Sequence, residues 1–354
     1  MPSNPAADTE LAMNDLGPLA WVLDELRKSL DSATKAMRRF VRDAELARGS
    51  DLTELDASQI RIARQQLHQA VGALEMVGME APAKVVRAME ALAQKFVQRP
   101  EQCSDDAAGR LERTSFALTE YLEGVLKGNS ASPVALFPQY RAVMDLVGSE
   151  RVHPSDLWSR EWRWLPLPVP TGAVAKDYAP AIRVKMDQAI LKIVKSGTAS
   201  AGRQMVGLCG SLAANQSTLE LKTFWTVAAA FFEALALELI PRDVYSKRTA
   251  SRILQQYATL AKGSEGVSER LARDLAFYCS IAVPRPGQAA PVLQAVRDAY
   301  SFTRTKAVNY DVEQFGRFDP ALLVLARRRI GSAAETWSAL AGGDTNRLKI
   351  AAEQ

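Results

Sequence analysis

Apolar residues recur every three or four positions along nearly the whole chain of 354 residues. In residues 19–48 this stripe runs from Leu19 to Val41 over about six turns, and the pattern breaks at Gly49. Short β-branched runs around Asn-Gly or Asp-Gly turns, which would indicate hairpins, do not occur in the sequence. No fixed repeat period stands out, so a solenoid is not indicated. The spacing therefore predicts an all-α protein built from helical bundles.

The predicted helices fall into two domains. After a disordered lead of residues 1–17, short connections join helices expected at 19–48, 56–77, 82–97, 104–127 and 133–147. Short connections favour antiparallel neighbours, so residues 18–150 are predicted to form an up-and-down helical bundle. A second all-helical domain is expected over residues 179–354, with helices at 180–195, 200–214, 218–240, 242–261, 268–281, 289–309 and 320–340.

Residues 151–178 are interpreted as the linker between these domains. Alternating prolines remove backbone donors and favour an extended path, and three tryptophans precede them. The segment contains Trp158, Trp162 and Trp164, followed by Pro166, Pro168 and Pro170. We expect the tryptophans to pin the linker across the preceding bundle; a ligand or partner groove is the alternative.

Three further segments bear on the environment of the chain. The longest apolar stretch, residues 224–240, includes Glu233 and Glu238 and is marginal for a bilayer of about 30 Å. It is therefore interpreted as the centre of a bundle rather than a membrane span. The basic run at 327–329 is interpreted as a solvated helix end, with an acidic partner or lipid headgroups as the alternative. Residues 347–354 look like a helix cut short, which suggests a fragment of a longer polypeptide.

The composition is that of an ordinary soluble protein, with 47% apolar and 24% charged residues. The net charge of +4 is too small to argue for nucleic acid, and the N-terminus lacks the basic and apolar regions of a signal peptide. Three distant cysteines in no C-x-x-C arrangement indicate neither a disulfide framework nor a thiolate metal site. We therefore expect a cytoplasmic protein with no metal, no cofactor and no membrane insertion.

Only two histidines are present, which narrows the search for chemistry. His153 lies in the linker and is assigned no role, whereas His68 lies one position beyond Leu67, at the edge of a buried helical stripe. A glycine in mid-helix costs about 1 kcal/mol relative to alanine, so Gly72, one turn after His68, needs a reason. One reason is room for a partner to approach the imidazole. The other is close helix packing beside a histidine of no consequence.

The sequence around His68 resembles the histidine phosphotransfer (HPt) signature. The resemblance is carried by His68, Gly72, Gly78 and the Met89-Glu90 pair on the following helix. It implies an up-and-down bundle with His68 as the candidate phosphoacceptor on the second core helix. It also implies that Glu90 accepts a hydrogen bond from Nδ1 of His68, which orients the ring and makes Nε2 the better nucleophile.

One position departs from this signature. The HPt lysine, three residues after the histidine, offsets charge on the incoming phosphoryl group and is replaced by Val71. Arg87, one turn before Glu90, is the candidate substitute. Without the lysine we expect slow transfer or none, and the docking face is assigned to Gly72, Val71, Glu75 and Arg87.

A wider resemblance covers essentially the whole chain and places it in type IV pilus (twitching motility) systems. The chain is similar to the N-terminal region of ChpA/PilL-type hybrid chemotaxis histidine kinases, and also to FimL, an HPt-like pilus regulator that lacks a phosphoacceptor. The segments that carry this similarity are 23–45, 61–82, 132–158, 224–236, 243–263 and 268–280. It implies a module of a two-component chemosensory system, with receiver domains of response regulators, the kinase core of the same longer polypeptide and pilus-pole proteins as partners.

Two functions stay open. In the first, which we prefer, the chain is a phosphorelay module in which His68 exchanges a phosphoryl group with receiver aspartates. In the second, it is a catalytically silent HPt-like scaffold that docks response regulators or pilus-pole proteins, as Val71 favours. A stand-alone enzyme is not indicated, because the sequence contains no H-E-x-x-H, P-loop, G-x-S-x-G or G-x-G-x-x-G motif. At most, the chain is a phosphotransfer domain of a larger histidine kinase.

Overall fold

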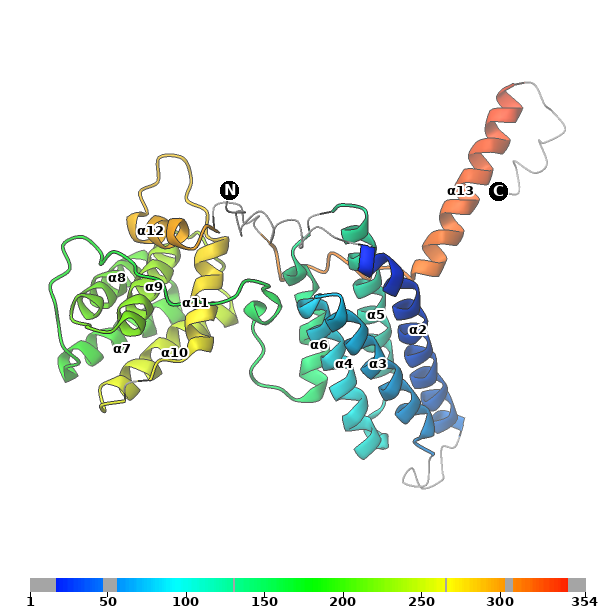
Figure 1. Ribbon diagram of the computed structural model, residues 1–354, viewed down its shortest axis with the longest axis horizontal. Helices are drawn as coiled ribbons and strands as arrows, with labels where there is room; N and C mark the ends of the chain where they lie inside the picture. Colours follow the sequence, from blue (N-terminus) through cyan, green and yellow to red (C-terminus); the bar gives the residue numbers. More distant parts are fainter. Residues whose placement is uncertain (1–16, 47–55, 130, 265, 303–307, 343–354) are drawn as a thin grey trace, which may run out of the picture. The chain divides into compact units, whose positions relative to one another are not determined.

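The computed structural model describes residues 17–46, 56–129, 131–264, 266–302 and 308–342 (Figure 1). All regular structure within these ranges is helical, as the spacing of apolar residues predicts. The chain forms two compact units: the segment His153–Asn309 makes one, and Met1–Val152 together with Tyr310–Gln354 makes the other. The predictions for residues 1–16 and 347–354 concern residues outside the described ranges.

The first unit is a bundle of antiparallel helices, as the short connections predict (Figure 1). Helix α2 packs against α3 and α5, α3 against α4, and α6 against α4 and α5. Its core is a continuous set of buried apolar side chains that includes Leu26, Leu67, Met89 and Leu118. The helices are α2 (Gly17–Leu46), α3 (Ser58–Met76), α4 (Glu80–Gln98), α5 (Asp105–Leu126) and α6 (Phe137–Val147), with short 3₁₀ turns η2 (Pro100–Gln102) and η3 (Pro133–Leu136).

The segment 310–318 packs in this first unit, whereas the sequence analysis assigned residues 179–354 to the second domain. The Tyr310 ring packs edge-on against Phe137, with ring centroids 6.0 Å apart. The backbone N–H of Gly316 donates to Oε2 of Glu120 at 2.9 Å, and Nε2 of Gln139 donates to the carbonyl of Phe315 at 2.8 Å. These contacts join residues more than 170 positions apart, so helical periodicity carries no signal for them.

Helix α13 (Pro320–Ala341) follows this segment. The arginines at 327–329 are exposed, as expected of a solvated run. They lie in the middle of the helix rather than at its end, because the helical pattern continues to Ala341. The interpretation as a helix end is therefore wrong.

The second unit is built around α9 (Leu219–Ala236). This helix packs against α8, α11 and α12, and both Phe231 and Trp225 are fully buried. The interpretation of the apolar stretch as bundle core is confirmed for residues 224–236, whereas residues 237–239 are half-buried or exposed. No described helix is long and apolar enough to cross a bilayer. The other helices of the unit are α7 (Pro180–Ser196), α8 (Ala199–Ala214), α10 (Val244–Leu260), α11 (Glu269–Ile281), α12 (Pro291–Ala299) and the 3₁₀ turn η4 (Pro154–Leu157).

Two helices of this unit are shorter than the sequence predicts. Helix α9 ends at Ala236 rather than at 240, where Glu238 turns the backbone to a φ of 56°. Helix α12 ends at Ala299 rather than at 309, and Ser301 follows with a φ of 53°. At this end the buried Arg297 guanidinium donates to the carbonyls of Cys279, Ser280, Ala282 and Phe302. These tertiary hydrogen bonds outweigh local helix propensity.

The Trp/Pro-rich segment packs within the second unit and not across the preceding bundle. Trp158 is buried against Phe277 and Phe302, with ring centroids 6.1 Å and 5.7 Å away. Trp162 stacks on Tyr300 at 5.2 Å. The path between η4 and α7 contains no helix or strand, in keeping with its alternating prolines. The tryptophans therefore attach residues 153–178, which we call the strap, to α11 and to the chain that follows α12.

Candidate functional site

Helix α3 presents His68 to solvent beside a glutamate from α4. The buried stripe of α3, which includes Leu67, Ala70 and Leu74, faces the core and leaves His68 one position outside it. The His68 side chain is 74% exposed, while the neighbouring Glu90 side chain is 20% exposed. Nδ1 of His68 lies 3.0 Å from Oε1 of Glu90. The structure thus brings together the two residues that the HPt resemblance pairs.

This contact sets the chemistry of the ring. A carboxylate only accepts hydrogen bonds, so Nδ1 of His68 carries the proton and donates it to Glu90. The neutral imidazole then has its lone pair on Nε2, on an exposed side chain. Glu90 also compensates the positive charge that the ring acquires when Nε2 forms a bond. This arrangement leaves Nε2 open to attack an electrophile while the contact with Glu90 fixes the ring.

Gly72 leaves open space on the same helix. A Cβ built on Gly72 meets no atom within 4 Å, so the glycine does not serve a close contact between helices. The packing alternative from the sequence analysis is therefore wrong. Beyond it, Met76 is 81% exposed and extends this surface with an apolar side chain. Gly78 follows α3 with a φ of 71°, a conformation that favours glycine.

Arg87 and Glu75 hold each other on this surface through an ion pair between their exposed side chains. Arg87 therefore shares its charge with Glu75, which weakens its case as the substitute for the missing HPt lysine. Exposed ion pairs of this kind contribute little to stability, with a median of about 0–1 kcal/mol.

Val71 is only 5% exposed, so it does not belong to the docking face to which the sequence analysis assigned it. It follows Leu67 by four positions and joins the buried stripe. An apolar side chain at this position widens that stripe, whereas a lysine would have to reach solvent.

Arg64, one turn before His68, is a further residue of this surface that the HPt resemblance does not indicate. Its side chain is exposed, and within the described residues it makes no hydrogen bond or ion pair. Residues four apart on a helix lie about 5–6 Å from each other at Cβ, so Arg64 is within reach of a group bound at His68. The i−4 spacing was visible in the sequence. The HPt signature does not predict it, because that signature places its cation after the histidine. We call Arg64, His68, Gly72, Met76 and Glu90 the His68 surface.

The second histidine, to which the sequence analysis gave no role, anchors a buried polar cluster in the second unit. The His153 ring caps η4: Nδ1 accepts a hydrogen bond from the backbone N–H of Ser155 at 3.1 Å. Nε2 therefore carries the proton and lies 3.3 Å from Oγ1 of Thr249 on α10. Oδ1 of Asp274 on α11 lies 3.3 Å from Nδ1 and accepts a hydrogen bond from the Ser155 hydroxyl. The cluster ties the strap to α10 and α11.

These groups resemble a Ser-His-Asp triad only in composition. His153, Ser155 and Asp274 are 4%, 2% and 0% exposed, so no substrate reaches them. Burial lowers the pKa of His153 to about 3, and the charges of Arg252 and Arg270 act in the same direction. Burial raises the pKa of Asp274 to about 6, against the hydrogen bond from Ser155 and the charge of Arg252. The His153 ring is therefore neutral, and its role is structural.

The described residues hold little other reactive chemistry. All three cysteines are buried: burial raises the pKa of Cys103 to about 12 and also raises that of Cys209 and Cys279. Thiols of this kind are poor nucleophiles. Within the described ranges no three His, Cys, Asp or Glu side chains gather where they could hold a metal ion.

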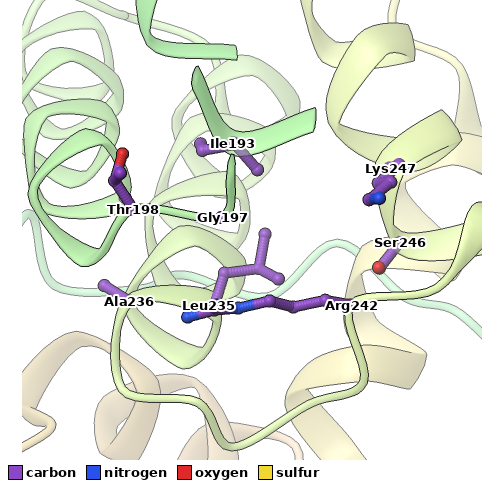
Figure 2. Close-up of a pocket in the computed structure, with 9 residues that line it drawn as sticks. Ile193, Gly197, Thr198, Leu235, Ala236, Arg242, Ser246 and Lys247 are labelled. Atoms are coloured by element: carbon purple, nitrogen blue, oxygen red, sulfur yellow. The ribbon is translucent and has the colours of Figure 1, made fainter. Parts of the chain in front are cut away.

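Three hollows lie in the described part of the second unit. The small pocket in Figure 2 lies between Ile193, Thr198 and Leu235, with Arg242 and Lys247 at its side, and holds about 10 Å³. That volume admits a single water. A groove of about 570 Å³ adjoins it along α10, and another of about 710 Å³ runs beside the strap and α8.

Comparison with known protein families finds a match that covers most of the second unit. Residues 171–313 match the family described as the second domain of the FimL scaffold protein. No curated protein and no solved structure matches the chain. The similarity to FimL inferred from the sequence is thus supported over this range, which lies largely within His153–Asn309. The resemblance to ChpA/PilL-type kinases stays a prediction.

Proposed function

We propose that this chain is a docking scaffold of type IV pilus chemosensory signalling that presents the His68 surface to receiver domains of response regulators. The observation that carries the proposal is the match of residues 171–313 to a domain of a scaffold protein. The HPt resemblance around His68 supplies the class of partner. Pilus-pole proteins are further partners that the same surface could serve.

The composition of the His68 surface supports docking. Gly72 offers open space at its centre, and the flexible apolar side chain of Met76 lies one turn beyond. An unbranched thioether adapts its shape to a partner at low cost. A well-packed contact at such a centre dominates binding, because surrounding groups exclude water from it.

The test is the affinity of the full chain for a receiver domain from a type IV pilus chemosensory system, measured by isothermal titration calorimetry. Gly72→Leu fills the open space and should weaken binding about tenfold or more, which corresponds to about 1.4 kcal/mol. His68→Gln keeps a polar side chain of similar size and should leave the affinity within about twofold.

Gly207→Leu is the matched control. Gly207 also lies in mid-helix, on α8 in the other unit, and its Cβ would meet no atom within 4 Å. It should leave receiver affinity unchanged. Equal affinities of wild type and Gly72→Leu would exclude the His68 surface as the docking site.

A second candidate function is phosphotransfer, which the contact between His68 and Glu90 favours. In this reaction Nε2 of His68 attacks the phosphorus of the receiver's aspartyl phosphate. The N–P bond forms as the bond from phosphorus to the aspartyl oxygen breaks, and the aspartate leaves as a carboxylate. Nδ1 keeps its proton and donates a hydrogen bond to Glu90, whose negative charge balances the positive charge on the ring. The receiver's own divalent ion neutralises the phosphoryl oxygens.

Radiolabelled phosphoryl transfer separates the two functions. The full chain is incubated with a phosphorylated receiver, and acid-labile, base-stable label on the chain is followed over time. Label that His68→Gln abolishes supports phosphotransfer. No label on a chain that still binds the receiver supports the silent scaffold, and label that survives His68→Gln excludes His68 as the acceptor.

A further inference from the structure

A basic groove runs along α10 in the second unit. About 570 Å³ in volume, it lies between the end of α7, at Val194, and one face of α10. Four cationic side chains line it: Arg242, Lys247, Arg248 and Arg252. The positions that α10 contributes span about 17 Å at 1.5 Å per residue.

The cations of this groove are only partly neutralised. Arg242 pairs with Glu238 at 2.7 Å, and Arg252 pairs with Asp274 at 3.2 Å. The side chains of Lys247 and Arg248 make no ion pair or hydrogen bond within the described ranges. Asp243 also lines the groove, but it is the N-cap of α10 and accepts the N–H of Ser246 at 2.8 Å. The groove therefore carries two unpaired positive charges.

The helix dipole does not offset these charges. Lys247 and Arg248 lie one turn into α10, near the end where the helix dipole is positive, and the acid at that end is the N-cap Asp243. Cations near this end of a helix gain nothing from its dipole. An anion in the groove would meet both the side chains and the dipole. The arrangement favours a negatively charged occupant.

The charge of the whole unit acts in the same direction. The segment His153–Asn309 has 20 lysines and arginines against 12 aspartates and glutamates, so its net charge is +8. The chain as a whole has only +4, because the rest of it is acidic. The small net charge of the whole chain is therefore the sum of a basic unit and an acidic remainder. The positive electrostatic field of the basic unit would steer an acidic partner toward the groove.

We propose that the groove lined by Arg242, Lys247, Arg248 and Arg252 is the docking site for an acidic segment of a protein partner. This proposal does not depend on the His68 surface. The groove is concave, and apolar side chains of Val194 and Val244 lie among its cations. A flat lipid surface would not enter such a groove, and an acidic segment with interspersed apolar residues fits both components.

The affinity of the groove for an acidic peptide should fall as the salt concentration rises. The probe is a fluorescein-labelled peptide of twelve residues, Asp/Glu-rich with two leucines, and its binding to the full chain is measured by fluorescence anisotropy. Lys247→Glu with Arg248→Glu should weaken binding at least about tenfold at 50 mM salt. Raising the salt to 500 mM should weaken the wild-type complex and reduce the difference between wild type and variant.

Lys262→Glu with Arg285→Glu is the charge-matched control. Both residues are exposed cations of the same unit outside the groove, and the double substitution changes the net charge equally. It should leave peptide affinity within about threefold.

Three results would overturn the proposal: no peptide binding, equal loss in both double variants, or the same variant-specific loss for anionic vesicles or duplex DNA. Circular dichroism and a thermal melt of each variant show that a loss of binding does not reflect unfolding. Both substituted sites are exposed or half-exposed, so the fold should be retained.

Discussion

At the scale of residues, the chemistry of this protein depends on which charged side chains are paired and which are not. Glu90 accepts a hydrogen bond from Nδ1 of His68, and Glu75 forms an ion pair with Arg87. Arg64 on the same surface has no such partner in the described part of the chain. The sequence could predict the first contact because the HPt resemblance names both residues. It could not predict the second, because no motif pairs Arg87 with Glu75 and their contact depends on how α3 packs against α4.

Glu90→Gln should slow phosphotransfer to His68 by about 10–100-fold. The amide removes the compensating charge and can donate to Nδ1, which moves the ring proton to Nε2 and blocks the nucleophile. The initial rate of labelling by a phosphorylated receiver measures this, with receiver affinity as the control. An unchanged rate would show that Glu90 does not position the ring.

Arg64→Ala should lower the same rate about tenfold, because Arg64 is the cation one helical turn from His68. Arg87→Ala should change the rate less than about twofold, since Arg87 is engaged by Glu75. The comparison is made at saturating receiver, so that weaker docking does not contribute. If Arg87→Ala lowered the rate more than Arg64→Ala, Arg87 and not Arg64 would be the residue that replaces the missing lysine.

The buried His153 should make stability depend on pH. The ordinary pKa of histidine is about 6.5, and burial lowers that of His153 to about 3. Its stabilising contribution is therefore complete above about pH 6.5 and is lost as the pH falls toward 3, since only the unfolded chain takes up the proton. Asp274, with a raised pKa of about 6, acts oppositely: its contribution is lost as the pH rises through 6.

His153→Gln isolates the histidine, because Asp274, Arg252 and Arg270 are present in both proteins. The difference in unfolding free energy between wild type and variant should shrink by about 2–3 kcal/mol between pH 7 and pH 4.5. Denaturant titrations at the two pH values measure it. A difference that does not vary with pH would mean that His153 is not held in its neutral form.

At the scale of elements, the sequence predicts the type and place of the helices better than their ends. The Ser104 cap of α5 is observed, with the hydroxyl oxygen accepting the N–H of Ala107 at 3.2 Å. The buried helix α9 was also foreseen, because a helix apolar on every side has to lie inside. The end of α12 was not, because Arg297 stops it through carbonyls from distant residues.

The segment before α13 depends on a single glycine. Gly316 has a φ of 76°, and a Cβ there would lie 2.6 Å from the carbonyl oxygen of Arg113 and 3.0 Å from the backbone nitrogen of Ala117. Gly316→Ala should destabilise the protein by about 2–3 kcal/mol, through both the strained backbone and the clash. Thermal unfolding of the first unit measures this effect.

Gly287→Ala separates the two causes. Gly287 has a similar φ of 79°, but its Cβ would meet nothing within 4 Å, so this change should cost only about 1 kcal/mol. Equal losses in the two variants would mean that residues 310–318 are not packed on α5.

At the scale of the whole molecule, the described residues form a bundle with an exposed histidine and a basic unit similar to the second domain of the FimL scaffold protein. Helical periodicity predicts that there are two helical parts. It does not predict that the strap belongs to the second or that residues 310–318 belong to the first. Both depend on ring contacts such as Trp158 with Phe277 and Tyr310 with Phe137, which periodicity does not encode.

The central claim is that the His68 surface docks receiver domains, and hydrogen–deuterium exchange tests it most directly. The full chain is labelled with and without a receiver domain from a pilus chemosensory system, and then again as Gly72→Leu. We predict slower exchange in peptides from α3 and α4 around His68 and Glu90 for the wild-type complex, with the slowing lost in Gly72→Leu. Protection that is confined to other helices, or that persists unchanged in Gly72→Leu, would contradict the account.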